Sequence, residues 1–352
     1  MSKLECRDFS VKYFGYDAAI SGVTTTFSDG INAIYAAEKS GKTTLLKALA
    51  GLSEYKGELT LDGVDLRDIS LKDRDFQMLF DDYALFSRHS ARYNLEYPLK
   101  LRKVPKEERK ARVEEAATLF DLDLMIDAPV YRLNEWHKVS LVLCRAYLRN
   151  AKVLLIDNIF AKLDPASRRE AFLRYLPLFA DRGIVVYATD LADEAAALSR
   201  KIKLLSYGYL LQEGSASDFN LRPSCLAAFT SFEKYPSVLP CVIGEQSVSL
   251  CGVTFPANAF CGLISDVYLG KEALAAFAPG DLALSDHGFE ARVTGRFFSD
   301  GEYVYALSAA ERPLFVICDG ELATGEVVRV AVRSVTRLFD RVNERAILRY
   351  EE

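Results

Sequence analysis

The 352-residue sequence contains no run of about 18 apolar residues, the length that a helix needs to cross a bilayer. Its start, MSKLECRDFS, has no apolar signal-peptide core, so we expect a cytoplasmic protein. Basic residues are not in excess, since the net charge is −5, and this argues against nucleic acid as a partner. The seven cysteines are scattered singly, without the paired spacing of metal ligands, and we expect them to be reduced.

The order of apolar runs predicts an α/β domain followed by a β domain. Residues 1–65 alternate short β-rich runs with turns, apart from the helical run TTLLKALAGL, and residues 105–149 have helical patterns. Two continuous apolar runs, AKVLLIDNIF and GIVVYATDL, flank a helical pattern, as buried parallel strands do. Residues 220–240 contain three prolines and read as a linker, after which short strands alternate with turns. We therefore expect domains at 1–235 and 236–352.

The segment AAEKSGKTTLL, between an expected strand and an expected helix, is typical of a phosphate-binding loop. Backbone N–H groups at the helix start bind phosphate oxygens, Lys42 reaches the terminal phosphates and the Thr43 hydroxyl holds Mg²⁺. The pattern asks for glycine where Ala36 stands, and a positive φ there would cost alanine about 1 kcal/mol. The loop is weakened by this exchange but not abolished.

A second motif, KVLLIDNIFAKLDP, ends its apolar strand in Asp157. P-loop enzymes place a carboxylate at this position for the magnesium ion and its water shell. An aspartate that only caps a strand end is the structural alternative for this residue taken alone. Together with the lysine loop, the motif indicates a site for Mg²⁺ and ATP.

These motifs resemble the nucleotide-binding subunits of ABC transporters, in particular the sugar-importer type similar to the maltose-importer ATPase subunit. The resemblance covers nearly the whole chain, through FGYDAAISGV, SGKTTLLKALAGL, GELTLDGVDL, MLFDDYALF, LVLCRAYLRNAKVLLIDNIFAKLDP, DEA and GEVVRVAVRSVTRLFD. It implies a P-loop ABC ATPase domain with a β-rich subdomain, a RecA-like core and a helical subdomain, followed by an OB-like (TOBE-type) β domain. It also implies a dimer that sandwiches two ATP molecules and moves the helices of a membrane permease.

The resemblance assigns an aromatic stacked on the adenine, a phosphate loop, a D-loop aspartate and two magnesium ligands to this chain. The residues at the nucleotide positions are Phe14, Ser40, Gly41, Lys42, Thr43, Thr44 and Asp164, and those at the magnesium positions are Thr43 and Asp157. For Phe14 an ordinary buried aromatic remains an equal alternative. The family's coupling surface for the permease corresponds to residues 81–98.

At most catalytic positions the chain departs from the family pattern. Besides Ala36, the more variable glycine is Lys39, the glutamine after MLF is Asp81, the glutamate after the magnesium aspartate is Asn158, and the switch histidine is Asp190. The signature LSGGQ is replaced by Leu133, Asn134, Glu135, Trp136 and His137.

The departures predict impaired hydrolysis. Asn158 cannot accept a proton as a general base, and Asp190 places negative charge where a donor should meet the γ-phosphate. In the signature, we expect Asn134 to be the residue that still donates to a phosphate oxygen. We therefore expect a degenerate subunit that binds Mg·ATP weakly, pairs with an intact ATPase subunit and docks on a permease at the inner face of the membrane.

Two alternatives stay open at this stage. One is an active homodimeric transport ATPase with an unusual arrangement for positioning water. The other is a free-standing regulatory module that uses the nucleotide fold as a ligand-dependent binding domain. The transported substrate and any ligand of the C-terminal domain cannot be read from the sequence.

Overall fold

The computed structural model describes residues 1–12, 19–245, 247–256, 266–333 and 337–347. It separates into two compact units, Met1–Glu213 and Gly214–Glu352. Within the described residues, no helix is both long and apolar enough to span a membrane.

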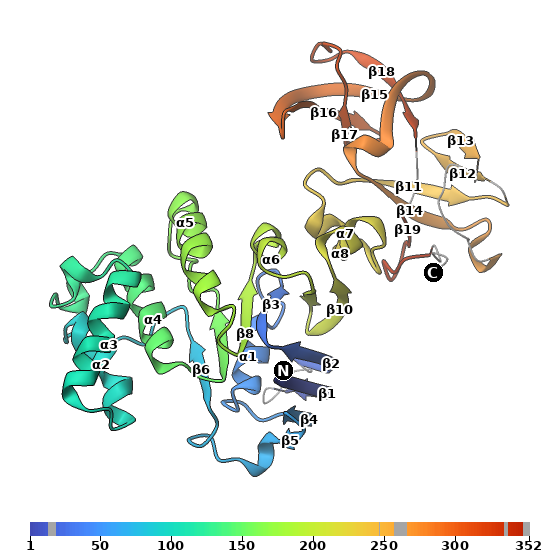
Figure 1. The fold of residues 1–352 in the computed structure, drawn as a ribbon. Helices are drawn as coiled ribbons and strands as arrows, with labels where there is room; N and C mark the ends of the chain where they lie inside the picture. Colours follow the sequence, from blue (N-terminus) through green and yellow to red (C-terminus); the bar gives the residue numbers. More distant parts are fainter. Residues whose placement is uncertain (13–18, 246, 257–265, 334–336, 348–352) are drawn as a thin grey trace. The chain divides into compact units, whose positions relative to one another are not determined.

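The first unit is built on a six-stranded sheet in which the expected parallel strands are neighbours (Figure 1). Its order is β10-β9-β3-β8-β7-β6, and a smaller antiparallel sheet has the order β2-β1-β4-β5. The first sheet comprises β3 (Gly30–Tyr35), β6 (Phe76–Leu79), β7 (Val153–Asp157), β8 (Ile184–Thr189), β9 (Ile202–Ser206) and β10 (Tyr209–Gly214). The second comprises β1 (Lys3–Val11), β2 (Ile20–Ser28), β4 (Lys56–Leu61) and β5 (Val64–Asp65). Every residue of β7 and β8 is buried. Both faces of these strands are therefore covered, which is why their sequences are continuous apolar runs.

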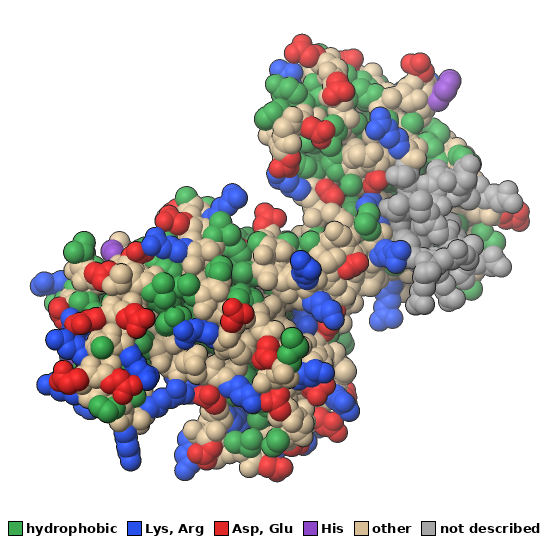
Figure 2. Space-filling view, viewed as in Figure 1, with side chains coloured by type: hydrophobic (Ala, Val, Ile, Leu, Met, Phe, Trp, Pro, Cys, Tyr) green, Lys and Arg blue, Asp and Glu red, His purple; other side chains and the backbone are tan. Residues whose placement is uncertain are grey.

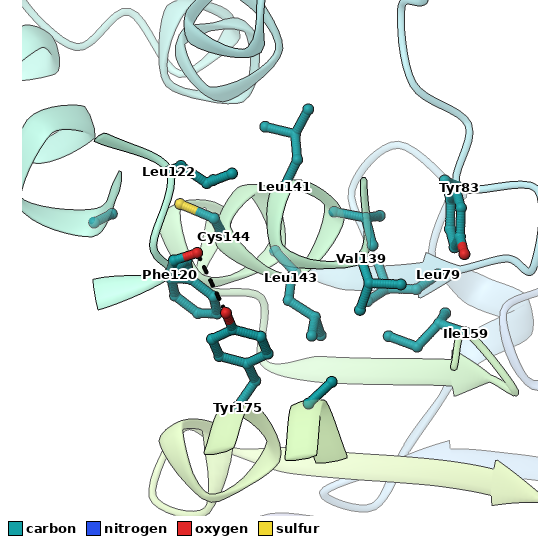
Figure 3. Close-up of a cluster of buried hydrophobic side chains, with 14 of the residues drawn as sticks. Leu79, Tyr83, Phe120, Leu122, Val139, Leu141, Leu143, Cys144, Ile159 and Tyr175 are labelled. Carbon is teal, nitrogen blue, oxygen red and sulfur yellow. Dashed lines mark hydrogen bonds between the residues drawn. The ribbon is translucent and has the colours of Figure 1, made fainter. Parts of the chain in front are cut away.

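Helices follow the strands of the large sheet and also form a separate group. They are α1 (Lys42–Leu49), α2 (Ala91–Leu101), α3 (Lys106–Leu119), α4 (Glu135–Arg149), α5 (Pro165–Tyr175) and α6 (Ala192–Leu198). In Figure 1, α2, α3 and α4 lie together beyond β6, as the expected helical subdomain. Figure 3 shows α4 placing Val139, Leu143 and Cys144 in the core that joins this group to the sheet. There the Tyr175 hydroxyl donates to the Phe120 carbonyl at 3.4 Å.

The second unit contains two short helices, α7 (Ala216–Leu221) and α8 (Leu226–Phe232), followed by strands. The strands form a five-stranded sheet, β13-β12-β11-β14-β19, and a four-stranded sheet, β17-β16-β15-β18, around one apolar core. They are β11 (Ser237–Ile243), β12 (Ser247–Leu250), β13 (Val253–Pro256), β14 (Glu272–Phe277), β15 (Leu282–Ser299), β16 (Glu302–Ala309), β17 (Arg312–Ile317), β18 (Val327–Val332) and β19 (Arg337–Asp340). The expected fold class, an α/β domain followed by a strand-rich domain, is confirmed.

The prediction of a linker at residues 220–240 is wrong. This segment contains α8 and the start of β11, because its apolar residues are used for packing rather than exposed. Phe229 of α8 is fully buried against Ala276 and Phe339 of the five-stranded sheet. The scattered prolines concealed this short helix from pattern analysis.

A buried ion pair joins α7 and α8 to the strands of the second unit. The Arg337 guanidinium, 4% exposed, lies 2.5 Å from an Asp281 oxygen, donates to the Asn220 carbonyl and stacks 4.6 Å from the Phe229 ring centroid. Removing one partner of such a pair leaves the other charge buried without compensation.

We expect Arg337→Met to lower the free energy of unfolding by about 3–5 kcal/mol. In the double variant with Asp281→Asn, much of this loss should be recovered because no charge is left unpaired. Arg329→Met, which breaks an exposed pair with Glu290, is the control and should cost under about 1 kcal/mol. Denaturant unfolding measures all three, and a loss below 1 kcal/mol in Arg337→Met would contradict this reading.

Candidate functional site

The loop between β3 and α1 has the backbone of a phosphate-binding loop. Its positive φ angles, however, lie at Lys39 and Gly41 and not at Ala36, where the sequence suggested one. Gly41 has φ 98°, and a Cβ there would lie 2.8 Å from the Ile20 Cδ1 atom, so only glycine fits. Lys39 takes a positive φ of 62° at the position of the variable glycine. Ala36, in contrast, does not have a positive φ. The expected strain at Ala36 is therefore wrong: its methyl is buried and its N–H donates to the Thr189 carbonyl.

Lys42, the first residue of α1, folds back over the loop. Its Nζ donates to the Ala36 carbonyl at 2.6 Å. Burial lowers the pKa of Lys42, although the nearby charges of Asp190 and Asp157 oppose this shift. The lysine is thus a cation held by a neutral carbonyl, which a phosphate oxygen can replace with a gain in charge attraction.

Asp157 ends β7 beside the loop and is 5% exposed. Burial raises its pKa, a hydrogen bond with Thr43 opposes the rise, and the negative charge of Asp81 adds to it. The predicted magnesium residues Thr43 and Asp157 are therefore in contact, with the exposed Asp81 close enough to act on them. A buried carboxylate, a hydroxyl and a second carboxylate are oxygen donors of the kind that Mg²⁺ prefers, so this set fits the ion.

Arg168, in the second turn of α5, connects the two departures at the catalytic positions. Its Nη2 donates to the Asn158 Oδ1 atom at 3.1 Å and to the Asp190 Oδ1 atom at 3.0 Å. Burial alone would raise the pKa of Asp190, but the Arg168 hydrogen bond and charge lower it overall. Asn158 and Asp190 are thus both acceptors for one cation.

A buried glutamate anchors the arginine from the other side. Glu194 of α6 accepts from Arg168 Nε at 2.6 Å, and the Tyr187 hydroxyl donates to its Oε2 at 2.6 Å. Burial raises the pKa of Tyr187 well above its ordinary value, and the negative charge of Glu194 adds to this rise. Sequence reasoning missed Arg168 and Glu194. The available signal was weak: an arginine four residues after Asp164, and a glutamate four after Asp190.

In the signature segment the bulky side chains turn away from the helix start. Asn134 caps α4, since its Oδ1 accepts from the His137 N–H at 2.9 Å. Glu135 pairs with Lys138 at 2.8 Å, and Trp136 packs 5.8 Å from the Tyr175 ring in the core. Leu133 is buried. Glu135 and Trp136 thus have partners on α4 and in the core, while the backbone N–H groups of the first turn lie at the helix start.

The remaining predicted residues have simpler positions. Asp164 caps α5 by accepting from the Ala166 and Ser167 N–H groups, both at 3.1 Å. Ser40 is buried, with its carbonyl accepting from Gly208, and Thr44 lies in the first turn of α1. Phe14 lies outside the described residues, so its role as an adenine platform stays a prediction.

We expect Asp157→Asn to raise the unfolding temperature of the ligand-free chain. A raised folded-state pKa means that ionising Asp157 costs stability as the pH rises from its ordinary value through the folded one, and asparagine removes this cost. The same change should abolish most of the stabilisation by Mg·ATP. Thermal unfolding with and without Mg·ATP measures both effects. Asp164→Asn is the control with little change expected, and a destabilised Asp157→Asn chain would contradict the argument.

Comparisons with known proteins agree with this geometry. Residues 31–161 match the family described as "ABC transporter". The Fe(3+) ions import ATP-binding protein FbpC of Escherichia coli K12 is 30% identical over 284 residues, which is 80% of each chain. The sn-glycerol-3-phosphate import ATP-binding protein UgpC of Roseobacter denitrificans is 27% identical over 82% of this chain and 80% of its own. The oligosaccharides import ATP-binding protein MsmX of Bacillus subtilis is 30% identical over 69% of this chain and 68% of its own.

The fold is also found in solved structures. "Structure of ATP binding subunit of ABC transporter" superposes with a TM-score of 0.54, at 20% identity, over 62% of this chain and 91% of that chain. At this identity the likeness concerns the fold alone, whereas two of the sequence relatives match 80% and 82% of this chain. The chain therefore belongs to the ABC transporter family, and within it to the ATP-binding subunits of importers.

Proposed function

We propose that this chain binds Mg·ATP without turning it over at a useful rate, as the degenerate member of an importer's pair of ATP-binding subunits. The observation that carries the proposal is the position of Arg168, whose Nη2 is shared by Asn158 and Asp190. The family's base and switch positions are thereby occupied by two hydrogen-bond acceptors of one arginine. An amide held in this way cannot take a proton from water at neutral pH.

Binding is retained by a different set of residues. Lys42 exchanges its loop carbonyl for a phosphate oxygen, and the N–H groups at the start of α1 bind the other oxygens. Thr43 and Asp157 would hold Mg²⁺, with Asp81 supplying a carboxylate oxygen where the family has an amide. Magnesium, when bound, neutralises phosphate charge. The γ-phosphate meets Asp190 already paired with Arg168, so the repulsion is smaller than an unpaired aspartate would cause.

The partners follow from the proposed role. A separate intact ATPase subunit would supply the catalytic site, and the permease would contact residues 81–98. Four aromatic rings gather there: His89 and Tyr93 stack at 4.0 Å, and Phe86 lies 4.9 Å from Tyr97. Arg145 of α4 holds the preceding loop through the Tyr83 and Ala84 carbonyls. Docking of residues 81–98 on the permease would put the chain at the cytoplasmic face of the membrane.

One observation favours an active homodimer as the second candidate. Glu135 and Trp136 turn away from the start of α4, so a backbone signature and the helix dipole remain for a phosphate across a dimer interface. Under this alternative, only the base position, Asn158, and the switch position, Asp190, lack the family's catalytic groups. The third possibility is a regulatory module that works without a permease. Purification of the chain without any partner protein would favour it.

We expect the purified chain to release phosphate about 100-fold more slowly than an intact family member, because both base and charge stabilisation are lost. Asn158→Glu alone should give little, because Asp190 still places a negative charge where the family has a donor to the γ-phosphate. Asn158→Glu with Asp190→His should raise the rate about 10-fold or more. Asn158→Gln with Asp190→His is the matched control without a base. A wild-type rate that is already typical of the family and vanishes in Lys42→Ala would favour the homodimer.

We expect the tagged chain to co-purify from native membranes with a second, intact ATP-binding subunit and a permease. In that complex Glu135→Gln should raise ATP turnover, because it removes a negative charge beside the helix start facing the partner's site, whereas Glu135→Asp keeps the charge and serves as the control. Trp136 is left in place because it packs in the core. Recovery of the chain as a homodimer on the permease would refute the heterodimer.

A further inference from the structure

A cavity of about 770 Å³ opens beside β1, β2 and β9 in the first unit, and its lining is strongly positive. Five cations face two carboxylates, although the chain as a whole has a net charge of −5. On the face shown in Figure 2, side chains of both signs are interspersed over the first unit. The lining cations are Lys3, Arg7, Arg200, Lys201 and Lys203.

Lys203 is the unusual member of this group because it lies within a buried strand. It is 2% exposed, and its Nζ lies 5.1 Å from the Phe27 ring centroid. Its ion pair with Glu213 spans 3.6 Å, longer than a charge-assisted hydrogen bond. Glu213 also accepts from the Thr25 hydroxyl, so its charge is shared. Burial lowers the pKa of Lys203, although the charge of Glu213 and a hydrogen bond with it oppose this shift.

The other four cations have no ion pair with any carboxylate in the part of the chain that the structure describes. Hydroxyl groups lie among them. The Thr24 oxygen accepts from the Asp8 N–H and keeps its own hydrogen to donate. Like charges that surround a partly desolvated lysine repel one another, and this cost is relieved by an anion that brings several acceptor oxygens.

We propose that this cavity binds a phosphate-bearing metabolite that carries at least two negative charges. A single carboxylate would leave two of the three excess positive charges uncompensated, whereas a doubly charged phosphate ester leaves one and brings more acceptor oxygens. The lining includes none of Lys42, Thr43 and Asp157, so this is a second anion site, separate from the nucleotide loop. The proposal is independent of whether the chain hydrolyses ATP.

Titration calorimetry with inorganic pyrophosphate tests the proposal on the full chain carrying Lys42→Ala, which removes the nucleotide-site lysine. We expect binding, and an affinity about 10-fold or more lower when Arg7→Gln and Arg200→Gln are added. Arg169→Gln with Lys110→Gln removes two exposed cations outside the cavity and should leave the affinity unchanged. No binding by the parent, or equal losses in both double variants, would overturn the site.

Two further measurements separate binding from structure and one ligand source from another. Lys203→Met with Glu213→Gln should keep or raise the unfolding temperature, because it removes a buried ion pair, while pyrophosphate no longer raises it. A lower unfolding temperature together with undiminished pyrophosphate stabilisation would make Lys203 merely structural and overturn the proposal.

Sedimentation with phosphatidylglycerol-containing vesicles should not differ between the parent and the Arg7→Gln, Arg200→Gln variant. A difference would assign the site to a lipid headgroup instead.

Discussion

The Arg168 guanidinium is the interaction on which the nucleotide-facing edge of the large sheet depends. One side chain from α5 is shared by Asn158 after β7, Asp190 after β8 and Glu194 on α6. Despite burial, these carboxylates raise the pKa of Arg168 above its already high value, so the cation is permanent. Without it, the carboxylates of Asp190 and Glu194 would lie close together with no cation between them and would repel one another.

This arginine also explains how a site can lose its catalytic groups and keep its fold. Asn158 and Asp190 differ from the family's base and switch in charge, yet both still serve the packing of the site as acceptors. Lys42, Thr43 and Asp157 make their own contacts, with the Ala36 carbonyl and with one another. The proposed loss of turnover and retention of binding are therefore compatible in one structure, because the proposal assigns them to separate side chains.

The signature segment illustrates a separation between backbone and side-chain roles. A phosphate at a helix N-terminus is bound by N–H groups and by the helix dipole, which depend on the backbone path rather than on residue identity. At α4 the Asn134 cap fixes that path, and the core takes up the Trp136 ring. The substitution looks severe in the sequence, but it changes the local charge through Glu135 more than it changes the shape of the helix end.

The sequence by itself determined the strands around Asp157, the lysine loop and the strand-rich C-terminal region, because apolar periodicity and short-range motifs are local properties of the chain. It also identified Asn158 and Asp190 as departures, through the resemblance to a family. It did not predict α8, whose burial depends on distant strands, nor the unstrained backbone of Ala36, which Thr189 sets across the sheet. Only tertiary structure brought Arg168 between Asn158 and Asp190, and Lys203 beside Arg7 and Arg200, since residues far apart in the chain meet only when their strands are paired.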